Sequence, residues 1–107
     1  MRRGDIVKVA LPGRYGKARP ALVIQSDLFD AHPSITVLPI TSELRDVPLF
    51  RITIEPNQEN GLRYTSQVMI DKAHTVPYEK LSLPIGRLTD EQVLIITRAL
   101  AVFLGFA

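Results

Sequence analysis

Eight proline residues divide most of this 107-residue sequence into short segments. Proline lacks a backbone N–H group and is rarely tolerated inside helices or central strands, so long regular elements are not expected where prolines are frequent. Short strands separated by turns favour a small, strongly curved sheet or barrel. Five short runs rich in β-branched and aromatic residues are the expected strands: 5–10, 21–25, 35–40, 49–54 and 64–70.

A single long helix is expected at the end of the chain. Thr89 can cap its first turn, Gln92 occupies the capping-box position and Gly105 marks its end. The apolar residues within 93–104 point in nearly every direction around the axis, whereas a helix that covers a small sheet needs only one apolar stripe. The extra apolar surface predicts a second copy of the chain as a partner, in a homodimer; the alternative is a helix covered by loops.

Length and composition predict one domain over residues 1–107, of the α+β class and mainly β. The absence of cysteine excludes disulfides, thiolate nucleophiles and Cys-type zinc sites. No apolar region typical of a signal peptide follows Arg2 and Arg3, and the longest apolar segment, 93–106, is shorter than the roughly 20 residues that span a bilayer. We therefore expect a cytoplasmic protein that does not associate with membranes.

Positive charge is concentrated at the N-terminal end. Residues 1–20 contain six basic side chains and one acid, a net charge of +5, whereas the rest of the chain has a net charge of −3. Such a field suits RNA or DNA, because phosphate contacts from Lys and Arg supply most of the sequence-independent affinity. A solvated basic edge that prevents unwanted strand pairing would have the same composition.

Residues 13–17 form an expected loop with the sequence Gly-Arg-Tyr-Gly-Lys. Arg14 and Lys17 can contact phosphate, and the ring of Tyr15 can stack on an unpaired base. The loop is therefore predicted to bind RNA, although an ordinary hairpin loop would look similar.

Two polar groups are expected to meet at the ends of neighbouring strands. Arg19 precedes Pro20, whose ring favours extended geometry in the residue before it, so the arginine lies at the entrance of the run 21–25. Thr41 leaves the end of the run 35–40. If these strands pair in antiparallel fashion, the start of the first lies beside the end of the second, which brings Arg19 and Thr41 together.

A series of short motifs resembles the MazF/PemK family of bacterial toxins. In order they are RRGDIV, GKARPALVIQSD, VLPITS, NGL, SQVMIDKAHTVP, IGRLTDEQ and ALAVFLGF. The resemblance covers nearly the whole chain. It implies an SH3-like small barrel of about five to seven strands with a C-terminal helix, a homodimer, sequence-selective cleavage of single-stranded mRNA, and neutralisation by a cognate, MazE-like antitoxin that occupies the RNA groove.

The family's functional residues map onto this sequence only in part. Its Arg before Pro matches Arg19, and the Thr of its Ile-Thr pair matches Thr41. Some members use an Arg-x-Asp at the end of a later strand; here Asp71 matches the acid, but Met69 occupies the arginine position. His74 stands where another arginine is often found, and it would be charged only part of the time near neutral pH.

The predicted chemistry needs no metal and no cofactor, because RNA carries its own nucleophile in the 2′-hydroxyl. Arg19 can hold two phosphate oxygens in the transition state, and Thr41 can donate one hydrogen bond there. Ser42, Asp71 and His74 are further candidates for catalysis or RNA binding, and the route of the proton stays unassigned. His and carboxylate residues show no spacing typical of a metal site.

Two other functions fit the same features. A CcdB-like DNA gyrase poison shares the barrel and helix, but its Trp-Gly-Ile tail is replaced here by a Trp-free ending, Leu104-Gly105-Phe106-Ala107. A non-catalytic small-barrel RNA-binding module, or a degenerate toxin, would also have a basic groove. Only an endoribonuclease would cut RNA.

Overall fold

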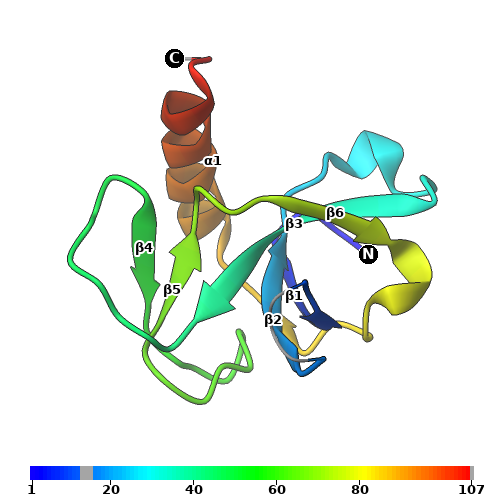
Figure 1. The fold of residues 1–107 in the computed structure, drawn as a ribbon, viewed down its shortest axis with the longest axis horizontal. Helices are drawn as coiled ribbons and strands as arrows, with labels where there is room; N and C mark the ends of the chain where they lie inside the picture. The colour runs from blue at the N-terminus through cyan, green and yellow to red at the C-terminus, as the bar shows by residue number, and fades with distance from the viewer. Residues whose placement is uncertain (13–15, 107) are drawn as a thin grey trace.

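The structure is a computed structural model that describes residues 1–12 and 16–106. It is mainly β, with one long helix at the C-terminal end (Figure 1). In chain order, the elements are β1 (Asp5–Ala10), β2 (Ala18–Val23), η1 (Asp27–Phe29), β3 (Ser34–Thr41), β4 (Arg51–Ile54), β5 (Ser66–Met69), β6 (His74–Pro77), η2 (Tyr78–Lys80), β7 (Gly86–Arg87) and α1 (Asp90–Leu104), where η denotes a 3₁₀ helix.

All seven strands belong to one antiparallel sheet in the order β4-β5-β3-β2-β1-β7, and β6 also pairs with β3. The longest strand, β3, pairs with β2 along one edge and with β6 and then β5 along the other. The sheet therefore curls around β3 into a half-barrel (Figure 1), as expected from the many short strands.

Alternate residues of β1, β2 and β3 face two different apolar clusters, because successive side chains of a strand point to opposite faces. Both faces of these strands are therefore buried, which explains why their apolar runs are nearly continuous. One cluster lies under α1 and contains the buried residues Ile6, Leu22, Leu38, Ile40, Ile54, Leu62, Val68, Ile70, Leu88 and Ile96. The other contains Val7, Val9, Leu11, Ala21, Val23, Ile35, Val37 and Val76.

The helix begins and ends where the sequence predicts. Thr89 and Gln92 form the capping box, and Gly105 ends the helix in the left-handed conformation at φ 83°. Within α1 only Ile96 is fully buried, and the C-terminal part projects beyond the sheet (Figure 1). No helix in the described parts of the chain is both long and apolar enough to cross a bilayer.

The strands differ from the expected runs mainly at their ends. β2 begins at Ala18 and ends at Val23, because its pairing with β1 starts before the apolar run. Two short strands, β6 and β7, were not predicted. β6 forms by pairing with residues 34–37 of β3, and β7 forms by pairing with Asp5 and Ile6 of β1. Both strands therefore depend on partners distant in the sequence and not on a strand pattern of their own.

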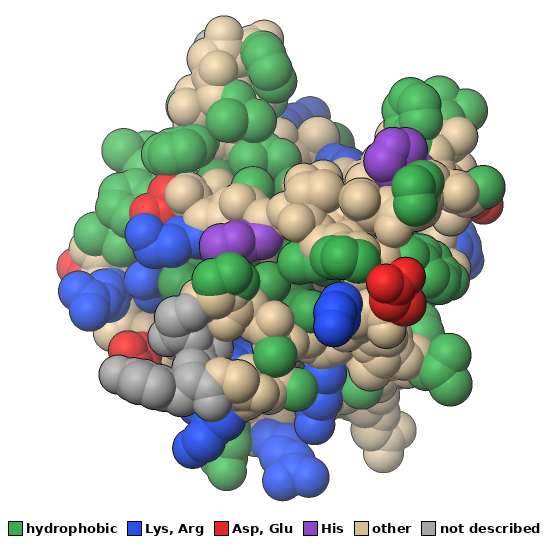
Figure 2. Space-filling model, turned by 45° about the vertical axis from the view of Figure 1, so that its right-hand side comes forward, with side chains coloured by type: hydrophobic (Ala, Val, Ile, Leu, Met, Phe, Trp, Pro, Cys, Tyr) green, Lys and Arg blue, Asp and Glu red, His purple; other side chains and the backbone are tan. Residues whose placement is uncertain are grey.

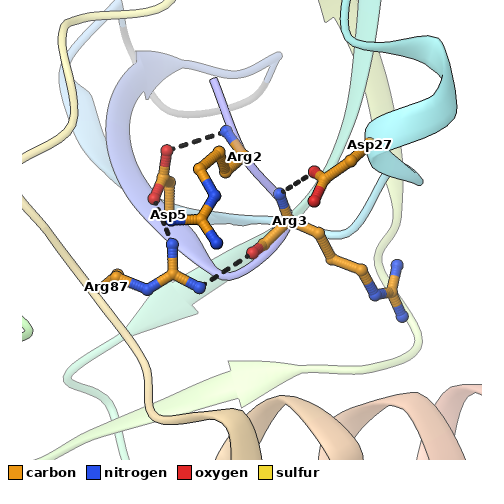
Figure 3. A network of polar contacts seen from close by, with 5 residues as sticks. All are labelled: Arg2, Arg3, Asp5, Asp27 and Arg87. Carbon is orange, nitrogen blue, oxygen red and sulfur yellow. Dashed lines mark hydrogen bonds and ion pairs between the residues drawn. The ribbon is translucent and has the colours of Figure 1, made fainter.

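A network of polar contacts fixes the N-terminal segment to the sheet (Figure 3). Arg87 donates from Nη1 to Asp5 Oδ1 at 3.0 Å and from Nη2 to the carbonyl of Arg3 at 3.3 Å. The backbone N of Arg2 donates to Asp5 Oδ2 at 2.8 Å, and that of Arg3 donates to Asp27 Oδ1 at 2.7 Å. The Arg-Arg-Gly-Asp segment is therefore a structural anchor for β1 and β7.

Candidate active site

A pocket of about 380 Å³ lies between β2, the end of β3 and the loop that joins β4 to β5. Within the described ranges, its walls carry more cations than anions, which suits a negatively charged ligand. The charged lining residues are Lys8, Arg19, Arg63 and Glu43, and the hydroxyl-bearing ones are Thr41, Ser42, Tyr64 and Ser66. The rest of the lining consists of Ala18, Pro20, Ile40, Gly61, Leu62 and Ile85.

Arg19 and Thr41 come together in this pocket, as their predicted strand pairing required. β2 and β3 are antiparallel, with Ala21 opposite Pro39. Arg19 and Thr41 each lie two residues beyond this pair, on the same side of it, and both line the pocket. Arg19 is exposed and Thr41 is half-buried, so both side chains line the same opening.

The hydroxyl of Thr41 is oriented by the backbone that follows it. Thr41 Oγ1 accepts a hydrogen bond from the amide of Glu43 at 3.1 Å. A hydroxyl has one hydrogen to donate besides its acceptor sites, so this contact leaves that hydrogen available for a ligand. Thr41 is therefore arranged as a hydrogen-bond donor within the pocket.

The segment after Thr41 is held by Gln67, which lies opposite Thr41 in the β3–β5 pair and is 6% exposed. Gln67 Oε1 accepts from the amide of Arg45 at 2.9 Å, and Gln67 Nε2 donates to the carbonyl of Arg45 at 3.0 Å. Arg51 Nη1 donates to the carbonyl of Glu43 at 3.3 Å. These bonds fix the polar wall of the pocket from behind.

The other predicted site residues are not all in the pocket. Ser42 lines it. Asp71 and His74 are not among its lining residues: Asp71 lies within 3.5 Å of the Lys72 ammonium, and His74 lies opposite Val37 in the β3–β6 pair. Their roles in catalysis or RNA binding stay predictions.

The predicted RNA-binding loop is described only in part. Arg14 and Tyr15 lie outside the described residues. Lys17 is exposed just before β2 and is not one of the residues that line the pocket. Its contact with RNA also stays a prediction.

Among the lining residues that sequence reasoning missed are three charged residues and one aromatic residue: Lys8, Glu43, Arg63 and Tyr64. Lys8 has a weak signal, because it interrupts an otherwise apolar strand and lies opposite Pro20, beside Arg19. The other three lie in loops, where neither strand alternation nor a motif indicates direction. Their approach to Arg19 depends on how the loops fold back on the sheet.

In the described residues, no group of three or more His, Cys, Asp or Glu side chains gathers in a way that could hold a metal ion. What the pocket offers instead is a guanidinium, two further cations and an oriented hydroxyl, facing one carboxylate among the described lining residues. Arginine presents a fixed fork of N–H donors that matches two oxygens of a phosphate. The arrangement is therefore suited to bind a phosphodiester and to stabilise charge that develops on it.

The chain is similar to known proteins over nearly its whole length. A family model described as PemK-like, MazF-like toxin of type II toxin-antitoxin system matches residues 2–104. The chain is 51% identical to the probable endoribonuclease MazF of Mycolicibacterium smegmatis over 108 residues, which cover 100% of this chain and 99% of that protein.

Solved structures share the fold. The Mycobacterium tuberculosis toxin MazF-mt6 aligns with a TM-score of 0.80 and 27% identity, over 94% of this chain and 96% of that one. An endoribonuclease in complex with its cognate antitoxin, from a mycobacterial species, aligns with a TM-score of 0.83 and 22% identity, over 100% of this chain and 97% of that one. At 22% identity the likeness concerns the fold alone.

Proposed function

Because the chain belongs to the PemK-like, MazF-like toxin family, we propose that it is an endoribonuclease toxin that cuts single-stranded mRNA in the pocket between β2, β3 and the β4–β5 loop. The observation that carries the assignment of the site is the convergence of Arg19 and Thr41 in one basic pocket. The family match does not favour the alternative gyrase poison or the non-catalytic RNA-binding module.

The proposed reaction is an internal transesterification of RNA. The 2′-oxygen on the 5′ side of the cut attacks phosphorus, a new P–O2′ bond forms and the P–O5′ bond breaks. The 2′-hydroxyl loses its proton, and the departing 5′-oxygen gains one from solvent. The products are a 2′,3′-cyclic phosphate and a 5′-hydroxyl, and no water is consumed in this step.

Arg19 is the proposed stabiliser of the transition state. Negative charge grows on the non-bridging phosphate oxygens as the 2′-oxygen attacks, and a guanidinium stays protonated throughout any working pH range. Its side chain is exposed at the pocket, so it can reach a phosphate without first being released from a buried contact. Charged donors aimed at developing charge are usually the largest single contribution to catalysis.

Thr41 and Glu43 are assigned the remaining steps. The oriented hydroxyl of Thr41 donates to a non-bridging oxygen of the same phosphate. Glu43 is the carboxylate that lines the pocket within the described ranges, so it is the proposed acceptor of the 2′-hydroxyl proton. This assignment replaces Asp71 and His74 as the first candidates for the base.

The proposed partners follow from the same family and from the surface of α1. The matching family model describes toxins of type II toxin-antitoxin systems, which supports a MazE-like antitoxin that binds this chain and blocks its pocket. Figure 2 shows hydrophobic side chains gathered at the upper left, around the projecting end of α1. A homodimer would cover this surface, whose exposed members include Leu94, Ile95, Val102, Phe103 and Leu104.

Incubation of the purified protein with a mixed single-stranded RNA, in the presence of EDTA, tests the proposed function. We expect discrete cuts that leave a 5′-hydroxyl and a 2′,3′-cyclic phosphate, and primer extension then gives the recognition sequence. A gyrase poison would leave RNA intact and inhibit DNA supercoiling. A binding module would retain RNA without cutting it, and either result would contradict the proposal.

A further inference from the structure

The β4–β5 loop, residues 55–65, is fixed by a buried asparagine. Asn60 is 1% exposed. Its Oδ1 accepts from the amides of Asn57 at 3.1 Å and Leu62 at 3.0 Å, and its Nδ2 donates to the carbonyl of Glu55 at 2.9 Å. A buried amide that makes three hydrogen bonds to the loop backbone holds the loop in one conformation, because each lost bond would leave a buried polar group unpaired.

Two glycines allow close backbone contact between this loop and the start of β7. Gly61 has φ +69°, and a Cβ atom there would lie 2.3 Å from the carbonyl oxygen of Ile85. A Cβ atom on Gly86 would lie 2.3 Å from the carbonyl carbon of Asn60. The two backbones are therefore in contact, and the residues just after Gly61 are presented on a rigid support.

Arg63 and Tyr64 are those residues. Both are exposed and both line the pocket that contains Arg19 and Thr41. Tyr64 is 67% exposed, and its carbonyl accepts a hydrogen bond from Ser66 Oγ at 2.7 Å, which fixes the backbone on its C-terminal side. An aromatic ring on an ordered loop at a basic opening is the arrangement that proteins use to stack an unpaired base.

We propose that Arg63 and Tyr64, on the β4–β5 loop, form a nucleotide-binding subsite in the pocket that contains Arg19, in which Tyr64 stacks on a base next to the scissile phosphate and Arg63 binds the following phosphate. This inference rests on the proposed function, because the ligand is the single-stranded RNA that is cut. The described lining of the pocket includes the cations Lys8, Arg19 and Arg63. They can bind successive phosphates of a single-stranded RNA, which carries one phosphate per nucleotide. Stacking orders the strand, so that the 2′-oxygen is placed for attack.

The experiment compares Tyr64→Ala and Tyr64→Phe with Tyr78→Ala as the matched control. Tyr78 is also an exposed tyrosine, at 44%, but it lies on η2 and does not line the pocket. On a short RNA that the wild-type protein cuts, we expect Tyr64→Ala to raise KM by about tenfold to a hundredfold. Tyr64→Phe keeps the ring and should stay within about threefold of wild type, as should Tyr78→Ala.

Arg63→Gln tests the phosphate contact, with Lys80→Gln on η2 as its control. We expect Arg63→Gln to weaken RNA binding. It should also reduce the slope of log Kd against log salt concentration by the amount that corresponds to one lost phosphate contact, whereas Lys80→Gln should change neither the affinity nor the slope. Binding is measured with the same oligonucleotide carrying hydrogen in place of the 2′-hydroxyl at the cut, which the enzyme cannot cleave.

The outcomes separate this inference from the proposed function. RNA left intact by the wild-type protein would overturn the proposed function. Cutting by the wild-type protein, together with a folded Tyr64→Ala variant that binds and cuts like wild type, would overturn the subsite alone. Circular dichroism melting of each variant establishes that it is folded at the assay temperature.

Discussion

Gln67 is expected to couple the stability of the fold to the activity of the pocket. Its side-chain amide makes four hydrogen bonds: two to the backbone of Arg45, one to Thr53 Oγ1 at 3.3 Å and one from Arg51 Nη1 at 3.4 Å. The two bonds to Arg45 are the short ones, at 2.9 and 3.0 Å. Gln67→Leu keeps the volume of the side chain and removes all four bonds.

The expected loss in the free energy of unfolding follows from the number and the lengths of these hydrogen bonds. Each ordinary hydrogen bond contributes about 1 kcal/mol net, and the two longer bonds count for less, so Gln67→Leu should lower the free energy of unfolding by about 2 kcal/mol. For a domain of this size that loss corresponds to a melting temperature about 10 °C lower. Urea unfolding followed by circular dichroism measures the free energy directly.

Activity should fall for a separate reason. Without Gln67 the segment from Ser42 to Arg45 loses its fixed position, so Glu43 no longer holds the Thr41 hydroxyl in one orientation. We expect kcat on a short RNA to fall by about tenfold at a temperature where the variant is still folded, with little change in KM. Thr53→Val is the matched control, because it removes only one long bond from an exposed residue.

A Gln67→Leu variant that unfolds at the wild-type urea concentration and cuts at the wild-type rate would show that Gln67 has neither role. Such a result would mean that the backbone of Arg45 keeps its position without the amide. A variant that is destabilised but fully active when folded would refute only the coupling to the pocket.

Three further substitutions test separate parts of the account. Thr41→Val removes one donor to the phosphate and also the acceptor of the Glu43 amide, so it should lower kcat by about tenfold to a hundredfold and cost about 1 kcal/mol of stability; an unchanged rate removes Thr41 from the mechanism. Glu43→Gln removes the proposed proton acceptor, and it should lower kcat with little change in KM; a kcat equal to that of wild type would exclude Glu43 as the base. Asp5→Ala leaves the Arg87 guanidinium without its carboxylate, and it should cost on the order of 3 kcal/mol in urea unfolding while the folded protein still cuts; a stability equal to wild type would show that the ion pair contributes nothing net.

The parts of the fold that follow from local signals could be predicted from the sequence. The helix has a cap and a stop that lie next to it in the chain, at Thr89 and Gly105, and both are where the structure has them. The pairing of β2 with β3 was also predictable, because the connection between the two apolar runs is too short to hold a crossover helix, which favours an antiparallel pair. That pairing alone brings Arg19 and Thr41 to one pocket.

The rest of the site depends on contacts between distant residues. Tyr64 reaches the pocket because Gly61 packs against Ile85, which is 24 positions away in the sequence. Gln67 supports the wall because β5 pairs with the end of β3. Neither residue carries a local pattern that distinguishes it from an ordinary polar loop or strand residue, so their roles required the tertiary structure.

The most direct test of the central claim is the rate at which Arg19→Ala cuts a short single-stranded RNA in EDTA, compared with wild type on the same substrate. We expect a loss of at least about a thousandfold in kcat, because the group that neutralises the developing charge at phosphorus is gone, while the melting temperature and the oligomeric state stay those of wild type. An Arg19→Ala protein that cuts RNA at the wild-type rate would contradict the account, whatever the other substitutions do.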